Sequence, residues 1–335
     1  MKLLVTGGAG FIGSSFVRMC VGAAHEVTVL DSLTYAGNIA NLDSVRQLKN
    51  YRLVKGDIRD ASLVLELLTS LKPDALVNFA AESHVDRSIM DASPFVSTNV
   101  AGTQVLLDAV RRSGVATRFL QVSTDEVYGS ADDHKPFTEQ HPLKPSSPIA
   151  ASKTAADLFV LSYQHTFKMD ALITRCSNNY GPYQFPEKLI PLFTTNLMEG
   201  RKVPVYGDGQ QIRDWIHCDD HSRGVIAALE KGRSGQVYNL GGGNRLANLD
   251  ITRTLLKQTG RGEEFIEYVA DRLGHDRVYL IDHSKATREL GWTPQVQFEE
   301  GLAATVDWYR HSRAWWEAVK SGAYREYYAK QYGSR

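Results

Sequence analysis

The chain has 335 residues, of which 43% are hydrophobic and 23% are charged, a composition typical of globular proteins. Its 38 Lys and Arg residues balance its 38 Asp and Glu residues, so no overall field favours nucleic acid or an anionic membrane as a partner. No apolar stretch approaches the ~20 residues that span a bilayer. These properties argue against a membrane-spanning protein and against binding of nucleic acid through net charge.

The N-terminus and the cysteines indicate the compartment. The apolar segment that follows Met1 runs into glycines after a few residues, unlike a secretory signal peptide. Cys20, Cys176 and Cys218 are odd in number, lie far apart and show no metal-ligand spacing. We therefore expect reduced thiols, no bound metal and a cytoplasmic location.

Apolar strands and amphipathic helices alternate through the first half of the chain. The periodicity predicts strands at 1–6, 26–30, 52–55, 75–79 and 118–122, and helices at 14–23, 61–71 and 99–113. Parallel strands joined through helices form a sheet that is covered on both faces. We expect an α/β fold of the Rossmann type, with a doubly wound parallel sheet.

The sequence changes character near residue 175. Prolines cluster, aromatic residues become more frequent and loops lengthen, which predicts a smaller lobe beside the main sheet. We place the first lobe at 1–175 and most of the second at 176–335, with segments near 215–240 returning to the first. The tail at 306–320 is predicted to form one amphipathic helix that packs on the surface.

A glycine-rich loop directly follows the first strand and opens the first helix. Glycine allows the tight turn, the close approach of a pyrophosphate and the packing of helix on strand, while the helix N-terminus faces the anion. The first lobe is therefore predicted to bind a dinucleotide. The residues expected to line this part of the site are Gly7, Gly10, Phe11, Ile12 and Gly13.

Acidic residues after the second and third strands refine this prediction. Asp31 lies 18 residues after Gly13, where a carboxylate holds the ribose hydroxyls and repels a 2′-phosphate, so NAD is favoured over NADP. Asp57 and Ile58 are placed to meet the adenine. An isolated aspartate at this point is as often a helix cap, and both interpretations stay open.

Thr124, Asp125 and Glu126 follow the strand at 118–122, at the edge of the sheet where α/β enzymes place their chemistry. Two adjacent carboxylates in a loop are most often solvated. In a buried site, however, burial and mutual repulsion would separate the pKa values of the two groups. One group could then act as an acid and the other as a base. The residues by themselves leave this choice open.

Seven segments, spread over almost the whole chain, together resemble the dTDP-glucose 4,6-dehydratases of the extended short-chain dehydrogenase/reductase family. They are TGGAGFIGS (6–14), DSLTYAGN (31–38), AAESHVDRS (80–88), STDEVYG (123–129), NNYGPYQFPEKLIP (178–191), RDWIHCDDH (213–221) and ADRLGHD (270–276).

The resemblance implies a Rossmann domain with a smaller C-terminal lobe for a nucleotide sugar, and a homodimer formed through helices near 99–113 and 149–168. It also implies an internal redox cycle in deoxysugar biosynthesis. Hydride passes from C4 of the sugar to NAD, water is lost across C5 and C6, and hydride returns to C6. The product is a 4-keto-6-deoxy sugar.

The resemblance assigns the catalytic roles. Asp125 is the acid on the C6 oxygen, Glu126 is the base at C5, and Thr124 donates to the C4 oxygen. Lys153 holds the nicotinamide ribose. The cofactor positions also include Ala80 and Ala81.

The sequence departs from the family at the catalytic tyrosine. The family pattern places tyrosine four residues before the lysine, on the same helix face, whereas this chain has Ile149 there. Isoleucine has no proton to exchange. Three explanations compete: another base serves in its place (Lys153, Asp125, a water or a nearby phenol such as Tyr128), the position was changed by design, or the chain binds its ligands without turnover.

These departures keep three alternatives to full 4,6-dehydration in view. A related dehydration would give an unsaturated sugar. A C4 epimerase would not need Asp125 and Glu126, so their presence counts against it. A catalytically silent protein that binds NAD and a nucleotide sugar is favoured by Ile149.

The second lobe supplies the nucleotide-sugar site implied by the resemblance. Two arginines and a lysine suit a diphosphate, and an aromatic ring suits the base. The positions are His84, Asn178, Lys188, Leu189, Pro204, Tyr206, Arg213, Asn248 and Arg272. Val278 replaces a second family arginine, which puts the identity of the sugar donor in question. His217 and His221 flank two aspartates, but no metal is expected there.

Overall fold

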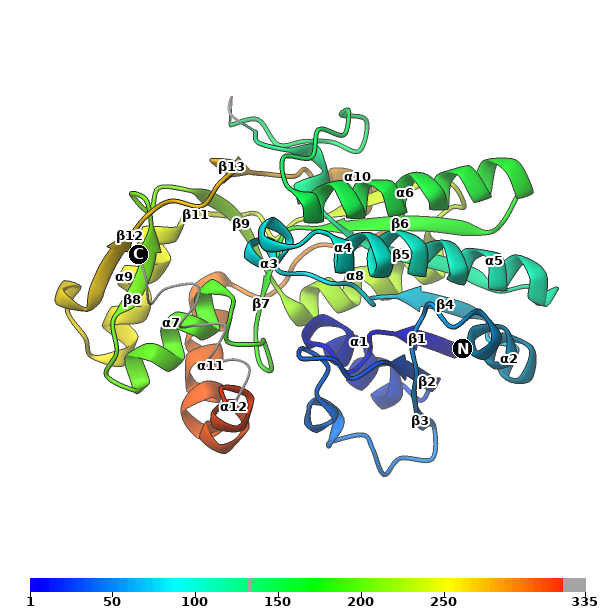
Figure 1. Ribbon diagram of the computed structural model, residues 1–335, viewed down its shortest axis with the longest axis horizontal. Coiled ribbons are helices and arrows are strands. Elements are labelled where there is room, and N and C mark those ends of the chain that lie inside the picture. Colours follow the sequence, from blue (N-terminus) through cyan, green and yellow to red (C-terminus); the bar gives the residue numbers. More distant parts are fainter. Residues whose placement is uncertain (132–133, 322–335) are drawn as a thin grey trace.

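A computed structural model describes residues 1–131 and 134–321 (Figure 1). Its main sheet has seven strands, all parallel, in the order β10-β6-β5-β4-β1-β2-β3. This arrangement confirms the predicted α/β Rossmann-type fold. The strands are β1 (Lys2–Thr6), β2 (Glu26–Asp31), β3 (Tyr51–Lys55), β4 (Ala75–Asn78), β5 (Arg118–Thr124), β6 (Ala171–Cys176) and β10 (Val237–Leu240).

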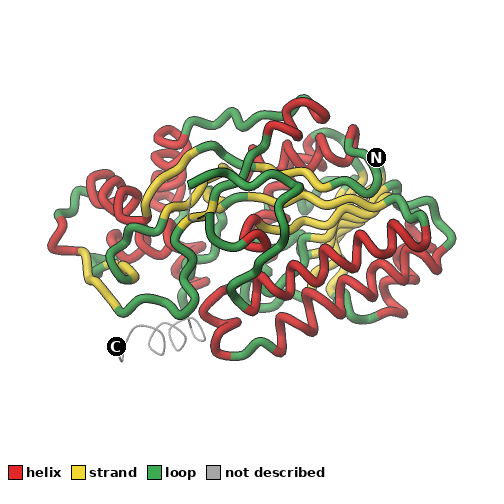
Figure 2. Tube along the Cα trace, turned by 90° about the horizontal axis from the view of Figure 1, so that it is seen from above, coloured by secondary structure: helices red, strands yellow, loops and turns green. Residues whose placement is uncertain are grey.

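Successive side chains of each strand point to opposite faces of this sheet, so the apolar core is divided between the two faces. Leu3 and Val5 of β1 pack toward one set of helices, whereas Leu4 packs toward the other. Figure 2 shows the strands as a layer flanked by helices. The first set is α1 (Phe11–Gly22), α8 (Cys218–Lys231) and α10 (Ser284–Leu290); the second is α2 (Ala61–Leu71), α5 (Thr103–Ser113) and α6 (Pro148–Phe167).

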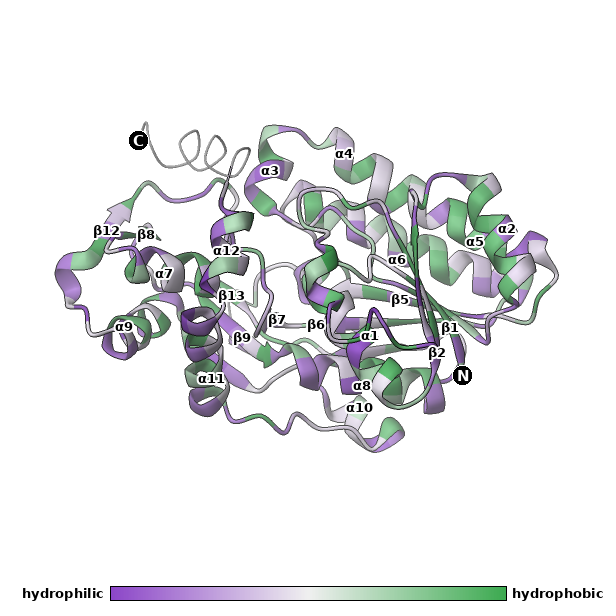
Figure 3. Ribbon diagram, turned by 90° about the horizontal axis from the view of Figure 1, so that it is seen from below, coloured by the Kyte–Doolittle hydropathy of each residue, from purple (hydrophilic) through white to green (hydrophobic). Residues whose placement is uncertain are grey.

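These helices bury one side and leave the other in water. Figure 3 shows apolar and polar residues interleaved along α2 and α5. In α2, Val64, Leu67 and Leu68 are buried, at the spacing of one helix face. None of the helices within the described ranges has the length and apolar character that a membrane crossing requires.

The order of the strands reverses beside β1, which pairs with β2 on one side and with β4 on the other. Ligands of open α/β sheets bind at such a switch point, outside the carboxyl ends of the strands. The segment after β4 carries two short helices, α3 (Val85–Met90) and α4 (Ser93–Phe95), and a π-helical turn at Val96–Gly102 that leads into α5. The helix predicted at 99–113 therefore begins with irregular winding.

The second lobe contains two small sheets. One is built from β7 (Asn178–Tyr180), β9 (Ile212–His217), β11 (Asn244–Ala247) and β13 (Val278–Tyr279); the other pairs β8 (Val203–Tyr206) with β12 (Ile266–Val269). Helices α7 (Leu189–Met198), α9 (Asn248–Thr259) and α11 (Phe298–His311) share an apolar core with β8 and β9. Between β9 and β11 of the first small sheet, the chain returns to the main sheet through α8 and β10.

The tail differs from the single helix predicted at 306–320. It forms α11 and a separate helix, α12 (Arg313–Val319), with Ser312 between them. The break lets Trp315 turn back onto Trp308 and donate from its indole N–H to Asn41 at 3.0 Å. Tertiary contacts of the aromatic residues thus override the continuous helical pattern.

Candidate active site

The glycine loop forms a close-packed turn at the carboxyl end of β1. Gly7 has a φ of +69°, and a Cβ there would lie 2.5 Å from the backbone nitrogen of Ala80, which follows β4. A Cβ at Gly13 would overlap the carbonyl oxygen of Gly7. Only glycine fits these positions. Gly10, Phe11 and Ile12 complete the turn into α1, whose first N–H groups face the sheet edge.

Asp31 ends β2 beside this loop. Its carboxylate accepts hydrogen bonds from the backbone N–H of Ala9 at 2.9 Å and of Leu33 at 2.8 Å. Burial raises the pKa of Asp31 above its ordinary value, and the two N–H groups oppose that rise. The aspartate therefore holds the glycine loop in shape at the position that the sequence assigns to a ribose.

Asp57 does not cap the following helix. That role belongs to Asp60, whose side chain accepts from the N–H groups of Ser62 and Leu63. Asp57 instead pairs with Arg59, with Nε–Oδ1 at 3.0 Å and Nη2–Oδ2 at 2.5 Å, and Arg59 lowers its pKa. The helix-cap interpretation of Asp57 is therefore wrong. Ile58 is buried against the π-helical turn.

The two candidate catalytic carboxyl groups lie in a 3-10 turn at the end of β5. Thr124 opens the turn by accepting from the N–H of Glu126 at 3.3 Å, and its hydroxyl donates to Asp125 at 3.2 Å. One oxygen of each carboxyl group is buried without a hydrogen-bond partner among the described residues. Such unpaired oxygens are costly in a protein interior, so they mark a site that a ligand completes.

Asp125 is in a setting that favours a neutral acid. Its side chain is 3% exposed. Burial raises its pKa well above the ordinary value, the charges of Glu126 and Asp214 raise it further, and Arg213 opposes the rise. A carboxyl group held neutral can donate a proton. Glu126 differs from Asp125 because it lines the adjoining cavity.

Lys153 and Ile149 lie in the first turns of α6. The Lys153 ammonium is buried, donates to the carbonyl oxygen of Val122 at 2.6 Å, and has its pKa lowered by burial. Ile149 is 5% exposed. Ser147 caps the helix by accepting from the N–H of Ala150 at 3.3 Å. The position that the family pattern reserves for a phenol is therefore filled by a buried aliphatic side chain.

Tyr128 is not available as a substitute base. Its hydroxyl donates to Asn239 at 2.9 Å and accepts from Arg175 at 2.9 Å. Its ring packs on Phe137, away from the cavity lining. These bonds and the distance from the cavity lining argue against Tyr128 as the group that replaces the missing phenol. A different phenol, Tyr279, lines the cavity and donates to Asp276 at 2.7 Å.

An open cavity lies between the lobes beside Glu126. All nine positions expected to hold the nucleotide sugar line it: His84, Asn178, Lys188, Leu189, Pro204, Tyr206, Arg213, Asn248 and Arg272. The lining also contains polar residues that the sequence reasoning missed, namely Glu187, His275, Asp276 and Tyr279. Glu187, His275 and Asp276 lie within segments that carry the family resemblance, and Tyr279 lies just beyond one, but only the fold shows that these side chains reach the cavity.

Cationic side chains of the lining are held by neighbours. Lys188 donates to the carbonyl oxygen of Ser83 at 2.5 Å. Arg213 donates to the carbonyl oxygen of Asp276 at 2.9 Å and stacks on Tyr279, with 4.2 Å from guanidinium carbon to ring centroid. The cavity therefore carries oriented positive groups that suit a diphosphate.

Val278 lies outside the cavity. It is buried in a small apolar cluster with Ala131 and Leu280. Its neighbour Arg277 points elsewhere and pairs with Asp208 at 2.8 and 2.9 Å. Neither Val278 nor Arg277 is therefore part of the cavity lining.

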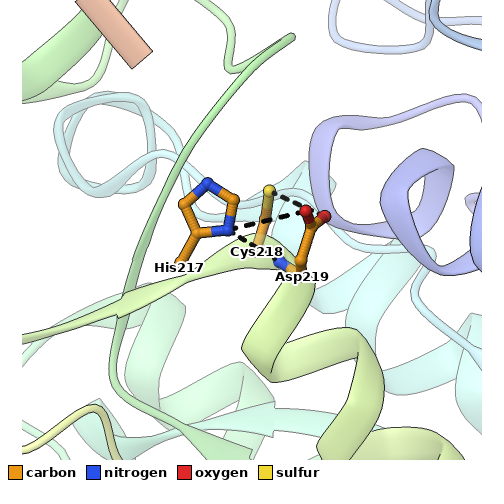
Figure 4. A group of neighbouring side chains, drawn as sticks. All are labelled: His217, Cys218 and Asp219. Atoms are coloured by element: carbon orange, nitrogen blue, oxygen red, sulfur yellow. Dashed lines mark hydrogen bonds and ion pairs between the residues drawn. The ribbon is translucent and has the colours of Figure 1, made fainter. Parts of the chain in front are cut away.

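His217, Cys218 and Asp219 gather at the start of α8, with their ligand atoms within 4.8 Å of one another (Figure 4). Their hydrogen bonds are those of a helix terminus. His217 accepts from the N–H of Asp219 at 3.2 Å, and Asp219 accepts from the hydroxyl of Ser15 at 2.8 Å. Burial raises the pKa of the Cys218 thiol, which disfavours the thiolate that a metal needs.

Comparison with known proteins places this site in a family. A family model described as GDP-mannose 4,6 dehydratase matches residues 4–305. A dTDP-glucose 4,6-dehydratase from Streptomyces niveus is 51% identical over 327 residues, which is 96% of each chain.

Solved structures agree with this relationship. The dTDP-glucose 4,6-dehydratase DesIV from Streptomyces venezuelae, with NAD and TDP bound, is 55% identical and has a TM-score of 0.93 over 96% of this chain and 100% of its own. A Bacillus anthracis dTDP-glucose 4,6-dehydratase in complex with NAD is 45% identical, with a TM-score of 0.90 over 96% of this chain and 100% of its own. A glycine-rich loop, two adjacent carboxyl groups and a cavity lined by cationic side chains thus occur on a fold shared with NAD-bound relatives, and the chain belongs to the family of NAD-dependent sugar-nucleotide 4,6-dehydratases.

Proposed function

We propose that the chain converts dTDP-glucose into its 4-keto-6-deoxy derivative with loss of water. The observation that carries this proposal is the pair Asp125 and Glu126, each with a buried, unpartnered oxygen, beside the cavity between the lobes. Elimination of water needs one group that gives a proton and one that takes a proton. A C4 epimerization needs no such pair.

The first lobe supplies the dinucleotide site in this proposal. NAD, when bound, accepts hydride from the sugar and later returns it. Gly7 and Gly13 let the loop turn tightly against the backbone around it, and α1 begins directly after this turn, so its N-terminal N–H groups would receive a pyrophosphate. Asp31 would hold the adenosine ribose, with Asp57, Ile58, Ala80 and Ala81 around the cofactor, and Lys153 would hold the second ribose.

The elimination step uses the two carboxyl groups in opposite protonation states. Glu126 takes the proton from C5 while Asp125 gives a proton to the C6 oxygen, so that the C5–H and C6–O bonds break and water leaves. Burial raises the pKa of Asp125 and favours its neutral form, which is the form that can act as the acid. Thr124 donates to Asp125 in this structure, and it would turn its hydroxyl proton to the C4 oxygen of a bound sugar.

The second lobe binds the nucleotide end. Arg213, Arg272 and Lys188 line the cavity and are the groups that would contact the diphosphate. Tyr206 offers a ring to the base. On this assignment, residues 1–175 with α8 and β10 form the cofactor domain, and most of 176–335 forms the nucleotide-sugar lobe.

A second candidate function rests on Ile149. A chain without a phenol at that position could bind NAD and the nucleotide sugar and turn over none of it. The presence of Asp125, Glu126 and Lys153 favours the enzyme, because Asp125 and Lys153 are buried and a carboxyl group or an ammonium is costly to bury without a use.

Incubation with NAD and dTDP-glucose in heavy water tests these functions. We expect a 4-keto-6-deoxy product by NMR and mass spectrometry, with deuterium at C5, and no water loss in Glu126→Gln. An exocyclic alkene would indicate the unsaturated-sugar reaction, and inversion at C4 with the C5 hydrogen retained would indicate an epimerase. Tight binding with unchanged sugar would indicate the silent binding protein.

The assembly and location form part of the same proposal. We propose a homodimer through the faces of α5 and α6 turned away from the sheet, where Leu158 and Phe159 are 54% and 38% exposed. Exposed apolar side chains grouped on one helix suit an interface. The three cysteines are free thiols, which supports a location in the reducing cytoplasm.

A further inference from the structure

Asp86 is a buried carboxylate at the junction of the two lobes. It lies in the first turn of α3, which sits between the lobes in Figure 1, and it is 5% exposed. It accepts from Arg272 through Nε at 2.6 Å and Nη2 at 3.0 Å, and from the hydroxyl of Tyr206 at 3.1 Å. Both partners come from the second lobe and line the cavity, whereas Asp86 itself does not.

The geometry of the pair fixes the direction of the guanidinium group. Guanidinium is planar and has five N–H donors in a rigid fork. Asp86 engages the edge formed by Nε and Nη2, so the Nη1 end of Arg272 lies outside this contact. The guanidinium also stacks on Tyr206, with 4.9 Å from its carbon to the ring centroid. Three contacts therefore hold one long side chain in a single orientation.

We propose that Asp86 is a positioning residue that orients Arg272 toward the diphosphate of the nucleotide sugar. This inference rests on the proposed function, in which the cavity binds a nucleoside diphosphate. A free arginine would lose its rotamer entropy when it binds the ligand. The bonds to Asp86 already order the Arg272 side chain before the ligand binds, so binding loses less rotamer entropy. The hydrogen bond from Tyr206 keeps the Asp86 carboxylate itself in place.

A competing role for Asp86 predicts the opposite result. Asp86 also neutralises Arg272, so a carboxylate that only competed with the diphosphate would weaken binding. Replacing it with asparagine keeps the shape and removes the charge. Asp86→Asn therefore weakens diphosphate binding if Asp86 orients Arg272, and strengthens diphosphate binding if Asp86 competes for it.

The test is calorimetric titration of the full chain with TDP, and with thymidine as a probe that lacks phosphate. For Asp86→Asn we expect TDP affinity to fall by about tenfold or more, the size of effect typical of a lost charge-assisted hydrogen bond. Thymidine affinity should change far less, because Arg272 is assigned to the phosphates. In turnover, KM for dTDP-glucose should rise with kcat little changed.

Asp208→Asn is the matched control. Asp208 also forms a bidentate pair with an arginine of the segment 270–277, but neither it nor Arg277 lines the cavity. Its substitution should leave TDP affinity unchanged. In an Arg272→Lys background, which lacks the fork, Asp86→Asn should cause little further loss, because the two residues act on the same contact.

NAD affinity and the thermal unfolding midpoint show whether each variant is folded. If Asp86→Asn does not fold, Tyr206→Phe removes one anchor of the carboxylate and should weaken TDP binding in the same direction. Unchanged or tighter TDP binding in a folded Asp86→Asn chain would overturn the inference. If the wild-type chain bound no TDP, the proposed substrate would fail, and the same comparison with UDP and GDP would decide the role of Asp86.

Discussion

Ile149 removes the proton-exchanging group from the helix face that carries Lys153. A buried ammonium one turn away would favour the phenolate of a tyrosine at this position. We therefore expect Ile149→Tyr to raise kcat for the dehydration by roughly 10²-fold or more, the contribution typical of a positioned general base. Steady-state assay of product formation measures the change.

Ile149→Phe separates the hydroxyl from the ring. It adds the same aromatic volume to the buried site and brings no proton. A rise in kcat for phenylalanine as large as for tyrosine would show that packing, and not proton transfer, limits the reaction. Equal rates in the wild type and Ile149→Tyr would show that another group already serves as the base.

Asp125 is expected to make the stability of the folded chain depend on pH. Because its pKa in the folded chain is raised above that of an unfolded aspartate, about 3.9, its contribution to stability is present at low pH and is lost as pH rises through the folded pKa. Asp125→Asn cannot ionise, so we expect it to unfold at a higher temperature than the wild type near pH 8. The difference should shrink toward pH 4. Calorimetric scans across this range measure it, and a difference that grows on acidification would contradict the assignment.

At the scale of elements, α6 has two faces with different tasks. One face buries Ile149, Lys153 and Asp157 against the sheet, and the other exposes Leu158 and Phe159. Large apolar side chains exposed on one helix face are typical of an interface and not of a helix that packs only within its own chain.

Placing a charge on the exposed face of α6 tests the dimer. We expect Leu158→Asp to shift the chain from dimer to monomer in sedimentation velocity, because a carboxylate would be desolvated in the interface. Leu48→Asp is the control, since Leu48 is 46% exposed on another part of the surface. Equal sedimentation of the wild type and Leu158→Asp would place the interface elsewhere, or show that the chain is a monomer.

At the scale of the whole molecule, the ligands would bind where the lobes meet. Asp86 and Arg87 of α3 pair with Arg272 and Glu187 of the second lobe. A ligand that binds only this folded arrangement stabilises it by about 2.7 kcal/mol at a concentration of 100 times its Kd. We expect NAD and TDP each to raise the thermal unfolding midpoint, measured by scanning calorimetry. Absence of a shift with saturating TDP would contradict the assignment of the cavity.

Local patterns in the sequence sufficed for several elements of the first lobe. The helix predicted at 61–71 coincides with α2, because Asp60 caps its start and Pro73 follows its end. The strand predicted at 26–30 is β2, which extends one residue further to Asp31. The tail was predicted less well, because contacts of Trp315 with residues far away in the chain break the helix.

The sequence by itself determined the fold class and the glycine loop, and its resemblance to a known family supplied the candidate catalytic and nucleotide-sugar residues, because these depend on motifs that are contiguous in the chain. Tertiary structure decided what depends on distant partners. It showed that Tyr128 is tied to Arg175, that Val278 packs away from the cavity, and that Tyr279 lines it. It also joined Asp86 to Arg272, 186 residues further along the chain. Pairing across such separations follows from the packing of the two lobes, which no local pattern specifies.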